Sequence, residues 1–341
     1  MSGASLNNKH IAIIGAGRWG KNLVRNFCEL LGADMVTCCD GDQTTLQNMA
    51  KSHPGIHTES EVTPLWENDS IQAVVISTPT ESHYQIAKSA LASGKHVLVE
   101  KPVCTSYRES MELCELAEKN GLILMVDHIL LYHPAVDELK KRLSAGELGE
   151  IRYLYAQRLN LGVIRSHENV LWSLGAHDIA VGLYLLKENP TEVCAQGGVY
   201  IQKTSGVHDV ALIEMRFPSG KMATLHLSWL DPHKVREITV VGDKKMAVFD
   251  DMEMREKLRI YDIGVKEIPG EENTEVRYGE VLIPNIASDE PLRLMCEHFL
   301  NCVSTGNKPI SDGVVGAKVI RILESANQSL SSNWGRIKIN W

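Results

Sequence analysis

Residues 10–20, HIAIIGAGRWG, join a short apolar run to three glycines with the spacing G-x-G-x-x-G. The following stretch, RWGKNLVRNFCELLG, has apolar residues at helical spacing. The glycine turn therefore lies between a predicted strand and a predicted helix, as the dinucleotide-binding fingerprint requires. Gly15 would form the turn, Gly17 would let a pyrophosphate approach the backbone, and Gly20 would let helix and strand pack closely. Free N–H groups at the helix N-terminus would face the phosphate.

The second predicted strand, DMVTCCD, ends at Asp40, 20 residues after Gly20. An acidic residue at this distance is expected to bind the adenosine ribose hydroxyls. Residues 41–43 include no Arg or Lys for a 2′-phosphate, so NAD is favoured over NADP. The alternative is an ordinary glycine turn followed by a solvated carboxylate.

The first third of the chain alternates apolar strands with amphipathic helices, which predicts a parallel sheet covered on both faces. Ser106 and Glu109 have capping-box spacing at the start of one helix. Later runs such as IRYLYAQRLN, MATLHLSWL and VREITVVG are short strands that suit an antiparallel sheet with one exposed face. We expect an α/β protein with a dinucleotide-binding domain over residues 1–128 and a second α/β domain over 129–341.

Composition excludes several classes of partner. The net charge is −8 and no long Lys/Arg run occurs, which argues against nucleic acids and anionic membranes. The N-terminus, MSGASLNNKH, lacks the apolar core of a signal peptide. The eight cysteines include no C-x-x-C pair, and the histidines show no metal-ligand spacing. We expect a reduced cytoplasmic protein without a metal.

Residues 96–103, HVLVEKPV, place Glu100 and Lys101 at the end of an apolar strand. Ligands of open parallel sheets bind beyond the carboxyl ends of the strands. Pro102 biases Lys101 toward an extended conformation, from which its ammonium group could reach a nicotinamide. A solvated ion pair at the strand end is the alternative. The pattern leaves open whether the Lys101–Pro102 bond is cis.

Three stretches, IAIIGAGRWGKN, STPTESHYQIAKSAL and GKHVLVEKPV, together resemble the Gfo/Idh/MocA oxidoreductases. The resemblance implies an N-terminal Rossmann domain and a C-terminal α/β domain with a large, open, mostly antiparallel sheet. It also implies that Lys101 lies where nicotinamide and substrate meet and stabilises negative charge on the reacting oxygen. Further cofactor-binding positions implied by the resemblance are Arg18, Trp19, Ser77, Thr78, Pro79, His83 and Glu100.

The segment HENVLWSLGAHDIAVGLYLL, residues 167–186, predicts a helix with His177 and Ser173 in one row beside an apolar stripe. A histidine in such a place is commonly a packing residue. The family resemblance instead implies an active-site histidine, often the last residue of Asp-x-x-x-His. His177 matches that histidine and would act as the base, whereas Ser173 occupies the Asp position.

Within the family, YHPAVDELKKRL, GELGEIRYLYAQRLNLG and VVGDKKMAVFDD resemble UDP-N-acetylhexosamine 3-dehydrogenases. This implies oxidation at C3 of a UDP-N-acetylhexosamine. Arg158 and Arg165 could meet the diphosphate, although either is equally a surface cation. Substrate contacts are also expected from Tyr132, His133, Asn160, Ser173 and the 167–169 loop. The exposed sheet face predicts a homo-oligomer, a dimer or tetramer. An inositol or aldose dehydrogenase, or a non-catalytic NAD-binding sensor, remain the alternatives.

Overall fold

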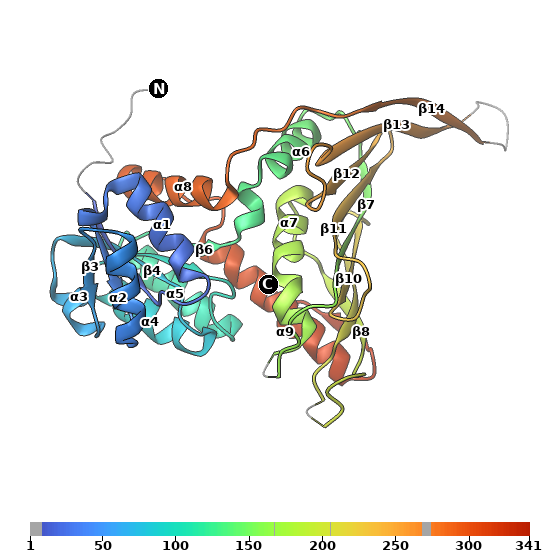
Figure 1. The fold of residues 1–341 in the computed structure, drawn as a ribbon. Coiled ribbons are helices and arrows are strands. Elements are labelled where there is room, and N and C mark those ends of the chain that lie inside the picture. Colours follow the sequence, from blue (N-terminus) through green and yellow to red (C-terminus); the bar gives the residue numbers. More distant parts are fainter. Residues whose placement is uncertain (1–8, 167, 205, 268–273) are drawn as a thin grey trace. The chain divides into compact units, whose positions relative to one another are not determined.

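The computed structural model describes residues 9–166, 168–204, 206–267 and 274–341, and it divides into two compact units. The first unit extends to Tyr132 and also includes Asp289–Ile320. The second unit comprises His133–Ser288 and Arg321–Trp341. The division falls inside the last long helix, α9, which spans Gly313–Ser331. Figure 1 shows the elements of both units.

The first unit is built on a six-stranded parallel sheet with the order β3-β2-β1-β4-β5-β6. Apart from the short edge strand β3, its strands are mostly apolar and buried, because helices follow nearly every strand and cover both faces. The elements are β1 His10–Ile14, α1 Gly20–Leu31, η1 Ala33–Met35, β2 Val36–Cys39, α2 Gln43–Ser52, β3 His57–Glu59, α3 Thr63–Glu67, β4 Ile71–Ile76, α4 Thr80–Ala92, β5 His96–Glu100, α5 Tyr107–Lys119, β6 Leu124–Asp127, η2 Ile129–Tyr132 and α8 Pro291–Thr305.

The second unit is built on a nine-stranded sheet with the order β14-β13-β12-β11-β7-β10-β9-β8-β15. Among the strands that the structure describes in this unit, only the β7–β10 pair is parallel, and the other neighbours are antiparallel. The elements are α6 Pro134–Ser144, β7 Ile151–Leu159, the π-helical turn η3 Leu171–Gly175, α7 Ala176–Leu186, β8 Glu192–Gly198, β9 Val210–Arg216, β10 Met222–Ser228, β11 Val235–Gly242, β12 Met246–Asp250, β13 Leu258–Glu267, β14 Thr274–Leu282 and β15 Ile337–Lys338.

The nine-stranded sheet buries one face only. Helices α6 and α7 lie on the same side of it, and inward side chains such as Leu154, Leu225 and Val240 are at most 2% exposed. The alternate residues of the same strands point the other way, where Tyr153 is 38% and Leu212 is 49% exposed. This alternation is the period-2 pattern of a half-buried antiparallel sheet. The predicted fold class is therefore confirmed.

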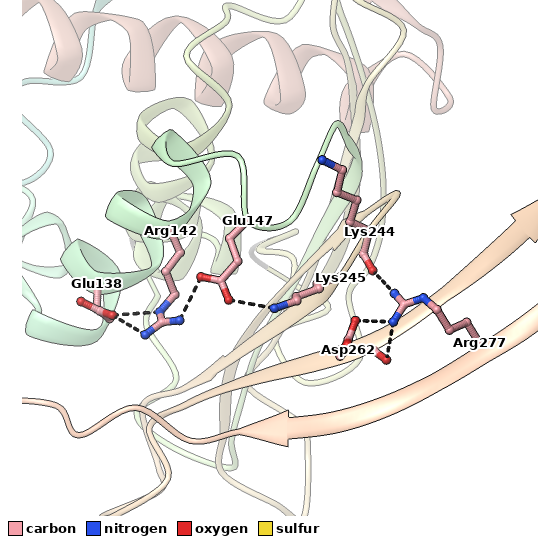
Figure 2. Close-up of polar contacts among 7 residues, drawn as sticks. All are labelled: Glu138, Arg142, Glu147, Lys244, Lys245, Asp262 and Arg277. Carbon is pink, nitrogen blue, oxygen red and sulfur yellow. Dashed lines mark hydrogen bonds and ion pairs between the residues drawn. The ribbon is translucent and has the colours of Figure 1, made fainter.

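Charged side chains connect α6 and the residues after it to the turn between β11 and β12 (Figure 2). The Arg142 guanidinium lies between Glu138 of the same helix and Glu147, with N–O distances of 2.8 and 2.9 Å. Lys245, in the turn between β11 and β12, donates to the other oxygen of Glu147 at 3.1 Å. These groups are only partly exposed, so the network is less screened than a surface ion pair.

Two details differ from the sequence-based expectations. The contacts group 289–320 with the first unit because α8 packs on α1: Phe27 and Phe299 meet edge to face at 6.4 Å, and Arg25 pairs with Glu290 at 2.6 Å. The boundary expected after residue 128 stays a prediction.

The expected capping box is not formed at the start of α5, since the Ser106 side chain makes no cap hydrogen bond to the described residues.

Candidate active site

The turn after β1 has the conformation that its glycines predict. Gly15 has φ +89°, and a Cβ there would lie 2.9 Å from the backbone of Ser77 and Thr78. A Cβ on Gly20 would lie 2.0 Å from the Gly15 carbonyl oxygen. A Cβ on Gly17 would meet no described atom within 4 Å, so this side of the turn is open. The turn therefore suits a pyrophosphate placed against its backbone and the start of α1.

The Asp40 side chain is hydrogen-bonded to this turn. Its carboxylate accepts the Ala16 N–H at 2.8 Å and the Asp42 N–H at 2.9 Å. Asp42 instead caps α2, accepting the N–H groups of Thr44 and Thr45 at 3.0 and 3.3 Å. Each carboxylate oxygen of Asp40 has a further lone pair for a ribose hydroxyl. A fixed negative charge at this point would also repel a 2′-phosphate.

Glu100 is the last residue of β5, and Lys101 follows it at the carboxyl edge of the parallel sheet. Glu100 is paired in register with Asp127 of β6. Burial raises the pKa of Glu100 well above its ordinary value, and the neighbouring Asp127 raises it further. Trp19, expected at the cofactor, donates its indole N–H to Asp127 Oδ2 at 3.0 Å. The Lys101–Pro102 peptide bond is cis.

His128 was missed by the sequence reasoning. Its side chain is 2% exposed, and neither ring nitrogen has a hydrogen-bond partner among the described residues. Burial lowers the pKa of His128 to about 3, and the charge of Lys101 acts in the same direction. The neutral ring has one donor and one acceptor, which together match a hydroxyl group. The sequence feature that could have identified His128 is its position directly after the carboxyl end of β6.

Two residues expected to bind ligands are buried in the first unit instead. His83 is 1% exposed, and both ring nitrogens lie against backbone carbonyls. The Tyr132 hydroxyl lies 2.9 Å from Ser311 Oγ, and its ring packs on His298.

The Ser77 hydroxyl contacts the glycine turn, donating to the Gly15 carbonyl at 2.6 Å. Of the remaining cofactor candidates, Arg18 and Pro79 are exposed, and Thr78 is half-buried.

In the second unit, His177 lies in the first turn of α7, directly after the π-helical turn that contains Ser173. Such π-helical segments occur frequently at functional sites. The next residue, Asp178, is 2% exposed and accepts two hydrogen bonds from Arg158 of β7, from Nε and Nη2, each 2.8 Å long. This bidentate pair holds α7 on the sheet beside His177.

The pair corrects the expected role of Arg158. Its guanidinium is buried and already bound to Asp178, so it is not available to a diphosphate. Arg165 is exposed and pairs with Glu168 at 2.5 Å. His133 is buried at the start of α6, where Nδ1 accepts the Ala135 N–H at 3.1 Å and the ring packs on Phe249. It therefore serves as a helix cap.

Asn160 is half-buried just after β7, and its backbone N–H donates to the Ser228 carbonyl at 3.1 Å. Residue 167 of the expected 167–169 loop lies outside the described residues.

Within the described ranges, no cluster of three or more His, Cys, Asp or Glu side chains could hold a metal ion. None of the described helices is long and apolar enough to cross a membrane.

Comparison with known proteins agrees with this geometry. Residues 9–128 match the model of an oxidoreductase family with an NAD-binding Rossmann fold, and residues 136–248 match the GFO/IDH/MocA C-terminal domain. UDP-N-acetylglucosamine 3-dehydrogenase of Acidithiobacillus ferrooxidans is 31% identical over 251 residues, covering 73% of this chain and 76% of that protein. The NAD⁺-dependent scyllo-inositol 2-dehydrogenase of Bacillus subtilis is 28% identical over 88% of this chain and 87% of its own length.

Solved structures agree in fold over nearly the whole chain. A structure of the A. ferrooxidans UDP-N-acetylglucosamine 3-dehydrogenase superposes with a TM-score of 0.80 at 25% identity, covering 95% of this chain and 97% of that one. Both domain models thus match a chain that has the Rossmann sheet, the glycine turn and a second, mostly antiparallel sheet. The chain belongs to the Gfo/Idh/MocA family of nicotinamide-dependent oxidoreductases and is a dehydrogenase-type enzyme.

Proposed function

We propose that the enzyme oxidises the C3 hydroxyl of a UDP-N-acetylhexosamine, with NAD as the hydride acceptor. The observation that carries the proposal is the 31% identity with UDP-N-acetylglucosamine 3-dehydrogenase over most of the chain. Lys101 supports it, since its position at the carboxyl end of β5 is at the edge of the sheet where ligands of this fold bind.

NAD is favoured over NADP by the charge at the end of β2. Asp40 is oriented by the N–H groups of Ala16 and Asp42, and residues 41–43 provide no cation for a 2′-phosphate. The glycine turn and Asp40 would hold the cofactor, whose bound nicotinamide supplies the hydride acceptor. A matched comparison of Kd for NADH and NADPH tests this assignment.

Oxidation of a secondary alcohol removes a hydride from carbon and a proton from oxygen, and a ketone remains. In our proposal His177 accepts the proton, because a neutral imidazole is a suitable base near neutral pH. Lys101 stabilises the negative charge that develops on the oxygen. Ser173 replaces the family's usual Asp, so His177 performs this step without that carboxylate.

The ion pairs of Arg158 and Arg165 change which of the two arginines we propose as a substrate contact. Arg158 is bound to Asp178, which leaves Arg165 as the candidate for the diphosphate, since its exposed pair with Glu168 can exchange for a phosphate oxygen. Asn160 and Ser173 remain candidates for contacts to the sugar. We also propose that the exposed sheet face around Tyr153 and Leu212 forms the contact of a homo-oligomer.

The test is incubation with UDP-GlcNAc, NAD⁺ and a glutamate-dependent sugar aminotransferase, because alcohol oxidation by NAD⁺ stops early unless the ketone is removed. The expected product is the 3-amino sugar nucleotide, detected by mass. The Lys101→Met enzyme is the matched control and should bind NADH without turnover.

A second candidate is a polyol dehydrogenase, which the 28% identity with scyllo-inositol 2-dehydrogenase favours. Reduction of NAD⁺ by inositol or glucose, with no product from UDP-GlcNAc or its C6-oxidised uronate, would replace the nucleotide-sugar assignment by this one. NADH binding without turnover of any of these compounds would instead point to a sensor.

A further inference from the structure

The imidazole of His83, in α4, is held between two backbone carbonyl groups. Nε2 lies 2.8 Å from the Thr78 oxygen, and Nδ1 lies 2.8 Å from the Pro102 oxygen. The side chain is 1% exposed. A carbonyl oxygen has no hydrogen to give, so the ring must be the donor in any hydrogen bond at either contact.

The two carbonyls belong to two separate parts of the first unit. Thr78 follows Ser77, which donates to the Gly15 carbonyl from its hydroxyl at 2.6 Å and to the Ile14 carbonyl from its N–H at 2.9 Å. Pro102 directly follows Lys101. The contacts therefore run without a break from the glycine turn, through Ser77, Thr78 and His83, to the segment that carries Lys101.

We propose that His83 is a positioning residue that joins the glycine turn to the Lys101 segment, with one hydrogen bond to a carbonyl when its ring is neutral and with hydrogen bonds to both carbonyls when the ring is protonated. It thereby sets the place of Lys101 relative to the cofactor without touching the cofactor. This rests on the proposed role of Lys101. It replaces the expectation that His83 itself binds the dinucleotide, because a side chain that is buried and bracketed by two carbonyls has no nitrogen left for it.

The arrangement is sensitive to pH because protonation changes the number of N–H groups on the His83 ring. A neutral imidazole has one N–H and can satisfy one carbonyl, whereas an imidazolium has two and satisfies both. The charged groups that act on the ring are Glu81, from the same helix, and Lys101, from the segment after β5. Burial lowers the pKa of His83, while the two carbonyls and Glu81 oppose that change. Acidification therefore completes the second hydrogen bond.

The test compares His83→Phe and His83→Gln with wild type. Phenylalanine fills the space without a donor, and glutamine keeps an amide N–H donor that does not titrate. The control is Tyr84→Phe in the same helix, which removes a hydroxyl that binds Glu112 outside this chain of contacts. The readouts are Kd for NADH and for NADPH by titration calorimetry, thermal unfolding, kcat and KM, each between pH 5 and 8.

We expect His83→Phe to weaken NADH binding about 10-fold, as for the loss of one net hydrogen bond, and to lower kcat as well. His83→Gln should fall between wild type and His83→Phe. It should also lack the tightening of NADH binding at low pH that we expect of wild type. Tyr84→Phe should match wild type.

A folded His83→Phe enzyme with wild-type Kd and kcat would overturn the proposal, as would a His83→Gln enzyme that keeps the wild-type pH dependence. If His83→Phe does not fold, the pH profile of His83→Gln decides. NADH binding needs no sugar, so failure of this proposal is distinguishable from an incorrect substrate assignment.

Discussion

Replacing Arg158 by Met should destabilise the second unit by about 3–5 kcal/mol. The two side chains of the Arg158–Asp178 pair are 9% and 1% exposed, and two hydrogen bonds of 2.8 Å join them. Removing the guanidinium leaves the Asp178 carboxylate buried without either bond, and each charge-assisted bond contributes about 1.5–3 kcal/mol. The free energy of unfolding would be measured by urea denaturation followed by circular dichroism.

The double variant Arg158→Met with Asp178→Leu should recover most of this loss, because no buried charge is then left unpaired. Arg158→Lys should lie between wild type and Arg158→Met, since an ammonium group cannot make the bidentate contact. The control is Arg165→Met, which breaks the exposed pair with Glu168 and should cost less than about 1 kcal/mol.

The same pair holds the helix that carries His177, so Arg158→Met should also lower kcat more than it raises KM for NAD. A loss of stability below about 1 kcal/mol for Arg158→Met would refute the reasoning. So would a double variant whose loss equals the sum of the two single losses, since the two side chains would then not interact.

Four further predictions follow from individual residues. Lys101→Met should leave the Kd for NADH within a few-fold of wild type while reducing kcat about 100-fold or more, measured by calorimetry and steady-state kinetics. His128→Leu should be as stable as wild type or more stable by about 1 kcal/mol in urea, because the described residues make no hydrogen bond to the ring; a loss of 2 kcal/mol would contradict this. Burial lowers the pKa of His133 to about 4, so the unfolded chain binds more protons below pH 6.5 and stability should fall from pH 6.5 to 4; His133→Asn should flatten that part of the urea-midpoint profile. Tyr153→Glu combined with Leu212→Arg should dissociate the proposed oligomer in sedimentation velocity, and an unchanged sedimentation coefficient would place the contact elsewhere.

The nucleotide-binding half could be predicted from the sequence because its signals are local. The spacing of Gly15, Gly17 and Gly20 between an apolar strand and a helix requires that turn, since a Cβ at Gly15 or Gly20 would overlap backbone atoms. The position of Asp40 follows from the length of one strand–helix–strand unit. Lys101 follows a continuous apolar run, so its place at the carboxyl edge of the sheet needed no tertiary information.

The element pattern of the second half was partly visible for the same reason. Strands β7, β9 and β10 alternate inward and outward residues, and this period was readable. The expected capping box at Ser106 failed, although its spacing was correct, because a side chain near a helix start can form other contacts or none. Spacing predicts where a helix begins better than it predicts which hydrogen bond forms there.

The partners of individual side chains were not readable from the sequence, since they depend on which elements become neighbours after folding. Arg158 and Asp178 are 20 residues apart and meet only because α7 packs on β7. His83 could not be distinguished from a cofactor ligand until the Thr78 and Pro102 carbonyls were seen on either side of its ring. Residues 289–320 look like any amphipathic helical segment, and only tertiary contacts assign them to the first unit: α8 packs on α1 and η2, and Ser311 and Asp312 pair with β6. Local pattern thus specifies strands, turns and the sheet edge, whereas the protonation and availability of a buried polar group depend on atoms brought to it from elsewhere in the chain.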